Sequence, residues 1–150
     1  MLKSRLIHPP LLDALAAAGH GSKVLIADGN YPGSTKLGPN AELIHLNFTP
    51  GTVSCTQVLE TLLTAIPVEA ATTMDYARSG PYGLSEDPPI WDEYRRILRH
   101  AGYGDLDLEP IERFAFYDAG ESPDVAVTIQ TGDQRIYANL LLTVGVVMPG

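Results

Sequence analysis

The stretch Val24-Leu25-Ile26-Ala27-Asp28 decides the fold, because a continuous apolar run here ends at a carboxylate. A short apolar run without alternating polar residues predicts a strand that is buried on both faces. Strands of that kind belong to parallel sheets that helices cover on both sides. Asp28 is therefore expected at the C-terminal end of a central strand, where open α/β sheets bind their ligands.

The segments on either side of this run alternate between helical and extended patterns. Pro9 and Gly19 bracket an apolar stripe at helical spacing, which predicts a helix over residues 9–18. Ser54 and Gln57 have the spacing of a capping box at the start of a second helix. The other expected elements are a loop at 29–40, helices at 54–66 and 90–101, and strands at 43–46, 68–74, 125–129 and 136–144.

The order of these elements predicts the fold class. Helices alternate with strands in the first part of the chain, and the last two strands are expected to pair through a tight turn at 131–133. The run Glu112–Tyr117 fits a strand as well as a helix, since Phe114 and Phe116 alternate while Arg113 and Tyr117 have helical spacing. We expect an α/β fold: a three-layer α/β/α single domain over residues 1–150, with a mixed, largely parallel central sheet.

The net charge and the cysteine content of the chain indicate which partners and which compartment fit it. The formal net charge is −8, which argues against nucleic acid and against an anionic membrane surface. The sequence has one cysteine, Cys55, so an internal disulfide is impossible and a reducing compartment fits best. No signal-peptide pattern and no apolar run long enough to span a bilayer is present. We therefore expect a cytoplasmic protein.

His20 lies between two glycines, Gly19 and Gly21, ahead of the first strand. Flanking glycines leave an imidazole accessible, and histidine titrates near neutral pH as a general acid–base must. Spacing alone favours an ordinary solvated loop histidine. For Asp28, the patterns divide evenly between a ligand-binding carboxylate and one that only caps a turn with Gly29.

Two further motifs carry polar groups suited to a small ligand. Arg113 stands among aromatic residues, where its guanidinium could present a fixed fork of donors to hydroxyls or carboxylates. Tyr137-Ala138-Asn139 offers side chains that both donate and accept hydrogen bonds, as sugar binding requires. From pattern alone, an aromatic core stripe and an ordinary strand start explain these two motifs more simply.

Metal and phosphate chemistry find little support. The histidines His8, His20, His45 and His100 do not occur in a spacing that places two on one helix face, and no cysteine pair exists. The run Gly19-His20-Gly21-Ser22-Lys23 lacks the spacing of a phosphate-binding loop and precedes a strand instead of a helix. No metal and no cofactor is expected.

Taken together, these motifs resemble the RbsD/FucU family of ribose pyranases and fucose mutarotases, over most of the chain. The N-terminal part, from Pro9-Pro10-Leu11-Leu12 through Gly19-His20-Gly21 to Ile26-Ala27-Asp28 and Pro32, is similar to the family's first motif. The run Arg113-Phe114-Ala115-Phe116-Tyr117 is similar to that of the fucose branch. The end of the chain, from Thr131-Gly132 through Tyr137-Ala138-Asn139 to Gly145-Val146, is similar to the family's last motif.

The resemblance implies a role for each of these residues. His20 would be the proton donor, and Asp28 would hold sugar hydroxyls or orient the reacting group. Arg113 would bind the substrate, with further contacts from Tyr137, Ala138 and Asn139. The family also implies a ring-shaped homo-oligomer, commonly a decamer, with its sites near subunit interfaces. Anomer exchange needs only a positioned acid–base, which agrees with the expected absence of cofactors.

The choice of sugar and the alternatives stay open at this stage. Arg113 points to L-fucose, whereas Tyr137-Ala138-Asn139 looks more like the ribose branch. The leading prediction is an isomerase that interconverts the anomers of L-fucose. The alternatives are a D-ribose pyranase or other sugar mutarotase, a non-catalytic sugar-binding or transport-accessory module, and a regulatory protein that acts through its ring assembly.

Overall fold

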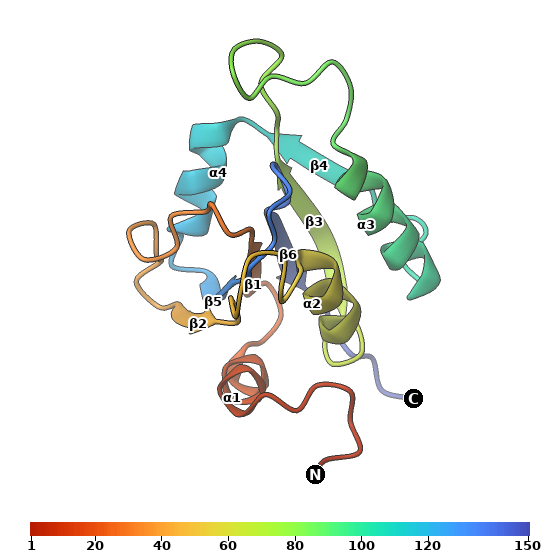
Figure 1. Cartoon of the computed structure of the whole chain (residues 1–150). Helices are drawn as coiled ribbons and strands as arrows, with labels where there is room; N and C mark the ends of the chain where they lie inside the picture. Colours follow the sequence, from red (N-terminus) through yellow and green to blue (C-terminus); the bar gives the residue numbers. More distant parts are fainter.

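The computed structural model describes residues 1–150 as one six-stranded sheet with four helices (Figure 1). The strands lie in the order β2-β5-β1-β6-β3-β4. Their bounds are β1 (Lys23–Ala27), β2 (Glu42–His45), β3 (Val68–Met74), β4 (Leu108–Ile111), β5 (Val125–Gln130) and β6 (Leu140–Val144). The helices are α1 (Pro9–Ala17), α2 (Cys55–Leu62), α3 (Pro89–His100) and α4 (Arg113–Gly120).

The sheet is mixed and largely parallel, as predicted. Strand β1 pairs in parallel with β5, and β5 pairs in parallel with β2. Strand β6 is antiparallel to both of its neighbours, β1 and β3, while β3 and β4 are parallel. Five strands therefore share one direction, and their C-terminal ends lie at the same end of the sheet, where β6 begins.

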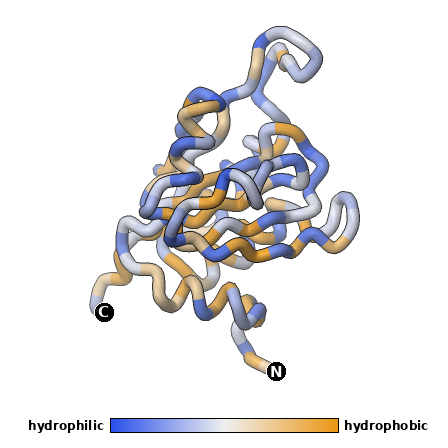
Figure 2. Tube along the Cα trace, turned by 90° about the vertical axis from the view of Figure 1, so that its left-hand side faces the viewer, coloured by the Kyte–Doolittle hydropathy of each residue, from blue (hydrophilic) through white to orange (hydrophobic).

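Helices cover both faces of this sheet, which confirms the three-layer prediction. The larger core lies between the sheet and α1, α2 and α3, and includes Val24 and Ile26 of β1. A smaller core lies between the other face and α4, and includes Leu25 and Ala27 with Phe116 of the helix. Alternate residues of β1 thus enter opposite cores, as expected of a strand buried on both faces. In Figure 2 the hydrophobic segments gather in these central strands.

Three expectations about the elements need correction. The strands near the C-terminus do not pair with each other: β1 lies between β5 and β6, and residues 131–139 cross over its end. The last strand begins at Leu140 and not at residue 136, because Tyr137 adopts a left-handed φ of 59° that a strand cannot contain. Strand β4 at the sheet edge was not anticipated.

The ambiguous run at Glu112–Tyr117 forms the start of α4. Glu112 is the N-cap, and its carboxylate accepts hydrogen bonds from the backbone N–H groups of Phe114 and Ala115. The predicted capping box at Ser54 and Gln57 is present at the start of α2. No helix of the structure has both the length and the apolar character that a membrane span would need.

Candidate functional site

A cavity of about 300 Å³ opens at the end of the sheet where the strands β1 and β3 finish and β6 begins. The start of α4 and the loop at 75–88 form its sides, and in Figure 1 this loop rises above the sheet between β3 and α3. The cavity thus lies where open α/β sheets bind ligands. Its lining residues are Asp28, Asn30, Tyr31, Met74, Tyr82, Arg113, Tyr117, Ile136, Tyr137 and Asn139.

Asp28 stands at the polar floor of the cavity, directly after β1. Its backbone N–H donates to Oδ1 of Asn139 over 2.8 Å, and its own Oδ1 accepts from the N–H of Asn30 over 2.9 Å. Only 4% of the residue is exposed. Burial raises the pKa of Asp28 to about 6, although backbone N–H groups nearby oppose the shift. Asp28 is therefore a carboxyl group that exchanges a proton close to neutral pH.

The segment that crosses over the end of β1 positions Asn139. Tyr137 turns the chain through its left-handed conformation. Its carbonyl accepts a hydrogen bond from the indole Nε1 of Trp91 over 3.1 Å, and the carbonyl of Ala138 accepts one from the Tyr94 hydroxyl. Both aromatic donors belong to α3, so this helix holds the crossing segment from behind while Asn139 faces Asp28.

An ion-pair network around the buried carboxylate of Asp133 also holds this segment, and its other members, Arg135 and Glu93, are half-buried. The guanidinium of Arg135 donates to both carboxylate oxygens of Asp133, over 2.9 and 2.7 Å, and to Glu93 of α3 over 2.8 Å. Burial alone would raise the pKa of Asp133, but Arg135 holds it below its ordinary value. Asp133 also accepts from the N–H of Cys55 and binds the N–H of Gly29 through its carbonyl. The turn after Asp28 is therefore tied to α2 and α3.

Arg113 is the first residue of α4 and projects into the cavity mouth. Its Nε donates to the hydroxyl of Tyr117 over 3.4 Å, and its guanidinium lies 5.6 Å from the centre of that ring. The Nη groups have no hydrogen-bond partner within the chain. The tyrosine thus holds one side of the guanidinium, and the other side remains available to a ligand.

The hydroxyl of Tyr137 is occupied by the loop at 75–88. It donates to the carbonyl of Tyr82 over 2.7 Å and accepts from the N–H of Ala77 over 3.2 Å. The ring of Tyr76 packs edge-on against Tyr137 and Trp91, with ring centroids 6.2 and 5.6 Å apart. Tyr137 therefore lines the cavity with its ring and anchors the loop with its hydroxyl.

His20 does not join the other predicted residues. The structure brings Asp28, Arg113, Tyr137 and Asn139 to one cavity, with Ala138 buried directly behind. His20 precedes β1, whose five residues rise about 3.3 Å each, so it lies roughly 16 Å or more from Asp28. The imidazole is exposed, and its Nε2 lies 3.0 Å from both carboxylate oxygens of Glu69. Within one chain, His20 cannot reach a ligand held by Asp28.

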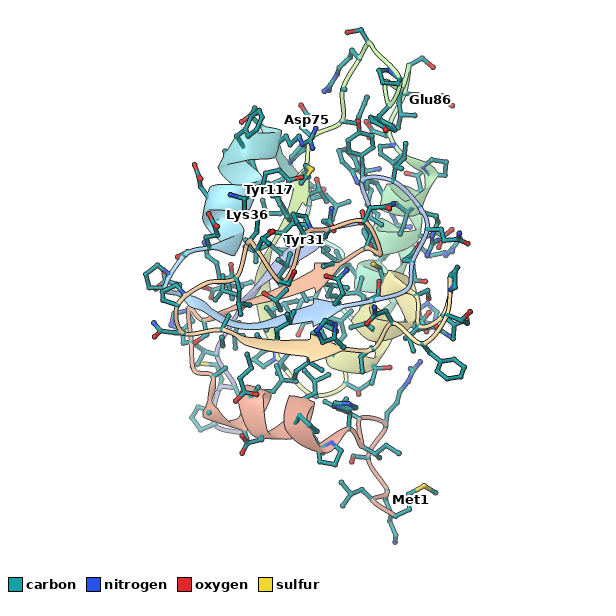
Figure 3. All side chains as sticks on the ribbon, turned by 60° about the vertical axis from the view of Figure 1, so that its left-hand side comes forward. Met1, Tyr31, Lys36, Asp75, Glu86 and Tyr117 are labelled. Carbon is teal, nitrogen blue, oxygen red and sulfur yellow. The ribbon has the colours of Figure 1, made fainter.

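Sequence reasoning missed several cavity residues. Tyr31 and Tyr117 pack at 5.7 Å between ring centroids, and Figure 3 shows them together beside α4. Asn30 and Tyr31 follow Asp28 in a loop whose length did suggest function. Met74 ends a strand whose alanines gave no sign of a site, and nothing in the sequence distinguished Tyr82 from other loop residues. No group of three or more His, Cys, Asp or Glu side chains is placed to hold a metal ion.

The cavity thus combines a carboxyl group with a pKa near neutrality, an amide, a guanidinium and several aromatic rings, which together suit a small polyhydroxylated ligand. The model of the RbsD / FucU transport protein family matches residues 1–147 of the chain. The protein therefore belongs to that family.

Individual relatives extend over nearly the whole chain. The fucose mutarotase of Danio rerio is 35% identical over 148 residues, which cover 94% of this chain and 90% of that protein. A D-ribose pyranase of Streptomyces avermitilis is 31% identical and covers 97% of this chain and 98% of that protein. The crystal structure of FucU from Bifidobacterium longum superposes with a TM-score of 0.77 at 34% identity, covering 95% of this chain and 96% of that one.

Proposed function

We propose that this protein is a monosaccharide mutarotase that interconverts the α and β anomers of L-fucose. The observation that carries the proposal is Asp28, a carboxyl group with a pKa of about 6 at the floor of a cavity built for hydroxyl groups. A general base is most effective when its pKa lies near the working pH. The similarity to fucose mutarotases, together with Arg113 at the cavity mouth, favours L-fucose among the candidate sugars.

The chemistry needs one base and one acid. The Asp28 carboxylate takes the proton of the anomeric hydroxyl while a protonated imidazole delivers a proton to the ring oxygen. The bond between C1 and the ring oxygen breaks, and an open-chain aldehyde forms. Rotation about the C1–C2 bond followed by the reverse transfers gives the other anomer and restores both groups. Arg113 and Asn139 hold the remaining hydroxyls during this rotation.

We further propose that the imidazole is His20 of a second copy of the chain. His20 lies at the end of the sheet opposite the cavity, where the N–H of Gly21 donates to the carbonyl of Val144. The segment after Val144 exposes the apolar residues Val146, Val147 and Met148, and Phe114, which follows Arg113 in the chain, is exposed as well. Contact between two different surfaces of the same chain is head-to-tail, and such contacts form a ring where the rotation from one copy to the next closes. We therefore propose a ring-shaped homo-oligomer, a decamer by family resemblance.

Glu69 supports this role for His20. Nε2 donates to the carboxylate of Glu69, and Nδ1 makes no hydrogen bond within the chain. A carboxylate partner of this kind fixes the orientation of the ring. We also propose that the protein acts in the cytoplasm, which the buried free thiol of Cys55 supports.

The test is the exchange rate between anomers, measured by saturation-transfer NMR with catalytic amounts of protein. We expect faster exchange for L-fucose than for D-ribose. A panel of monosaccharides in which no exchange is accelerated would refute the enzyme and leave a sugar-binding or transport-accessory module. In that case binding would survive the change His20→Gln, since a binding module has no need of a proton donor.

A D-ribose pyranase is the second candidate, and one motif favours it. Tyr137-Ala138-Asn139 resembles the ribose branch, and the D-ribose pyranase of Streptomyces avermitilis matches nearly the whole chain. The same panel separates the two, because this candidate predicts faster exchange on D-ribose than on L-fucose.

A further inference from the structure

A separate cavity of about 530 Å³ lies between α2 and α3. The two helices pack against each other on one face of the sheet (Figure 1). The cavity shares no lining residue with the cavity at Asp28. Its volume is in the range that small-molecule sites occupy. The proposed sugar chemistry therefore leaves this second cavity without a role.

Arg96 of α3 places a positive charge without a partner in this cavity. The guanidinium of Arg5, which also lines it, lies 3.1 Å from the carboxylate of Glu60, so these two charges offset each other. Arg96 makes no ion pair and no hydrogen bond within the chain. His100 follows four residues later, on the same face of the helix. The polar side of the cavity thus offers one free guanidinium beside an imidazole.

The dipole of α3 does not account for Arg96. Basic residues in the last turn of a helix, here Arg99 and His100, offset the partial negative charge of its C-terminal end. Arg96 lies before that turn and lines the cavity, whereas Arg99 does not line it. Arg96 is therefore a local positive site on a chain whose formal net charge is −8.

Apolar side chains form much of the rest of the cavity. Leu63 at the end of α2 and Ile97 of α3 are partly buried and pack against the larger core. Ala101 comes one turn after Ile97 and continues this apolar row along α3. A ligand paired with Arg96 would therefore place its carbon atoms on a surface that the core holds in position.

We infer that this cavity binds a small organic carboxylate, whose anionic group pairs with Arg96 and whose carbon body lies on the apolar row. A guanidinium holds a carboxylate through two parallel hydrogen bonds. One free guanidinium matches one negative charge. The C-terminal ends of α2 and α3 carry partial negative charge, which disfavours a doubly charged group such as a phosphate monoester. The inference does not depend on the proposed function.

Three ligands test the two halves of the site. Phenylacetate has a carboxylate and an apolar ring, phenylacetamide keeps the ring without the charge, and acetate keeps the charge without the ring. Their dissociation constants are measured on the whole protein by saturation-transfer-difference NMR titration. Phenylacetate should bind about tenfold more tightly than acetate, since burying roughly 60 Å² of carbon gives that factor. It should bind about fivefold more tightly than phenylacetamide, because hydrogen bonds to charged groups are stronger.

Matched variants test the residue that carries the inference. Arg96→Met removes the guanidinium but keeps an apolar stem, and it should weaken phenylacetate binding about fivefold. Arg99→Met removes a charge from the same helix outside the cavity, and screening should keep its effect within about a factor of two. Arg113→Met removes the guanidinium at the cavity near Asp28 and should leave phenylacetate binding unchanged. All three arginines are exposed, so the variants should keep the fold, which thermal melting checks.

Four results would overturn the inference. The first is the absence of saturable phenylacetate binding, and the second is equally tight binding of phenylacetamide or of acetate. The third is equal weakening by Arg96→Met and Arg99→Met, which would indicate diffuse attraction instead of a site. The fourth is loss of binding in Arg113→Met, which would place the ligand in the cavity at Asp28. A failure of anomer exchange would overturn only the proposed function, because the two cavities share no residue.

Discussion

The residues at the two ends of strand β1 differ in burial and in the number of hydrogen bonds that hold them. At the C-terminal end, Asp28 is 4% exposed and is held by Asn139 and Asn30 at the floor of a cavity. At the N-terminal end, His20 is exposed and contacts one partner, Glu69. The first end therefore holds its own geometry. At the second end His20 borders a separate open cavity of about 580 Å³, but its imidazole has a single partner and no buried polar group beside it, so its proposed chemistry depends on what is placed against it.

The largest expected effect on the exchange rate comes from removing the charge of Asp28 at the C-terminal end of β1. Asp28→Asn should lower the exchange rate by about 10²–10⁴-fold, because the general base is lost. It should also stabilise the protein at pH 8 by roughly 2–3 kcal/mol, since an ionised buried carboxylate is removed. Saturation-transfer NMR and chemical denaturation measure the two effects.

The sign of the pH dependence follows from the raised pKa. The folded state keeps a proton on Asp28 up to about pH 6, whereas the unfolded chain loses it near its ordinary pKa of 3.8. Asp28 therefore lowers the free energy of unfolding as pH rises from about 4 to 6. The stability advantage of Asp28→Asn should disappear near pH 4. An advantage of equal size at pH 4 and pH 8 would contradict the pKa shift.

The next largest effect should come from the ion pair beneath the site. Arg135→Met leaves the buried carboxylate of Asp133 without its main partner and should cost roughly 3 kcal/mol of stability at neutral pH. Because the pKa of Asp133 is lowered in the folded state, this contribution exists at neutral pH and is lost on acidification below its ordinary range. The matched control is Arg95→Met, which breaks only exposed pairs and should cost less than about 1 kcal/mol.

A smaller effect is expected where α4 meets the loop after Asp28. A Cβ atom at Gly120 would overlap the hydroxyl of Tyr31, which is buried and has no hydrogen-bond partner. Gly120→Ala should therefore destabilise the protein by about 1–3 kcal/mol. Adding Tyr31→Phe should recover most of this loss, because it removes the overlapping oxygen. Additive effects in the double variant would mean that the two residues do not meet.

The smallest stability effect is expected at the exposed end of β1. Glu69→Gln removes the carboxylate that holds His20, and an exposed pair of this kind contributes less than about 1 kcal/mol to stability. If Glu69 orients the imidazole, the variant should nevertheless lower the exchange rate while the melting temperature stays the same. An unaltered exchange rate would show that the pair is only a surface contact.

The sequence predicted the C-terminal end of β1, at Asp28, better than the N-terminal end, at His20. An apolar run ended by an aspartate is a local signal, and it placed Asp28 correctly at the end of a central buried strand. Strand β4 escaped prediction because Leu108-Glu109-Pro110-Ile111 contains a proline and lies at the sheet edge, where such strands are tolerated. The expected pairing of β5 with β6 was wrong because Thr131 bonds to Ala27 and leads the chain past β1.

The remaining gaps have the same physical origin. Whether residues 112–117 were helix or strand depended on the Glu112 cap, which is visible only as a contact between its carboxylate and two backbone N–H groups. Tyr82 and Met74 line the cavity because segments far apart in the sequence meet there, and no local sequence pattern predicts such a contact. For His20, the sequence motif suggests a role that one chain cannot supply, and we propose that the missing surroundings belong to another molecule.

Complementation between two inactive variants tests the central claim, that each site combines Asp28 of one chain with His20 of another. His20→Gln and Asp28→Asn proteins are unfolded together, refolded as an equimolar mixture and assayed for L-fucose exchange. In a randomly mixed head-to-tail ring, about one quarter of the contacts join two natural residues, so about one quarter of the natural activity should return. If the mixture is no more active than the separate variants, sites do not combine residues of two chains, and the account is contradicted.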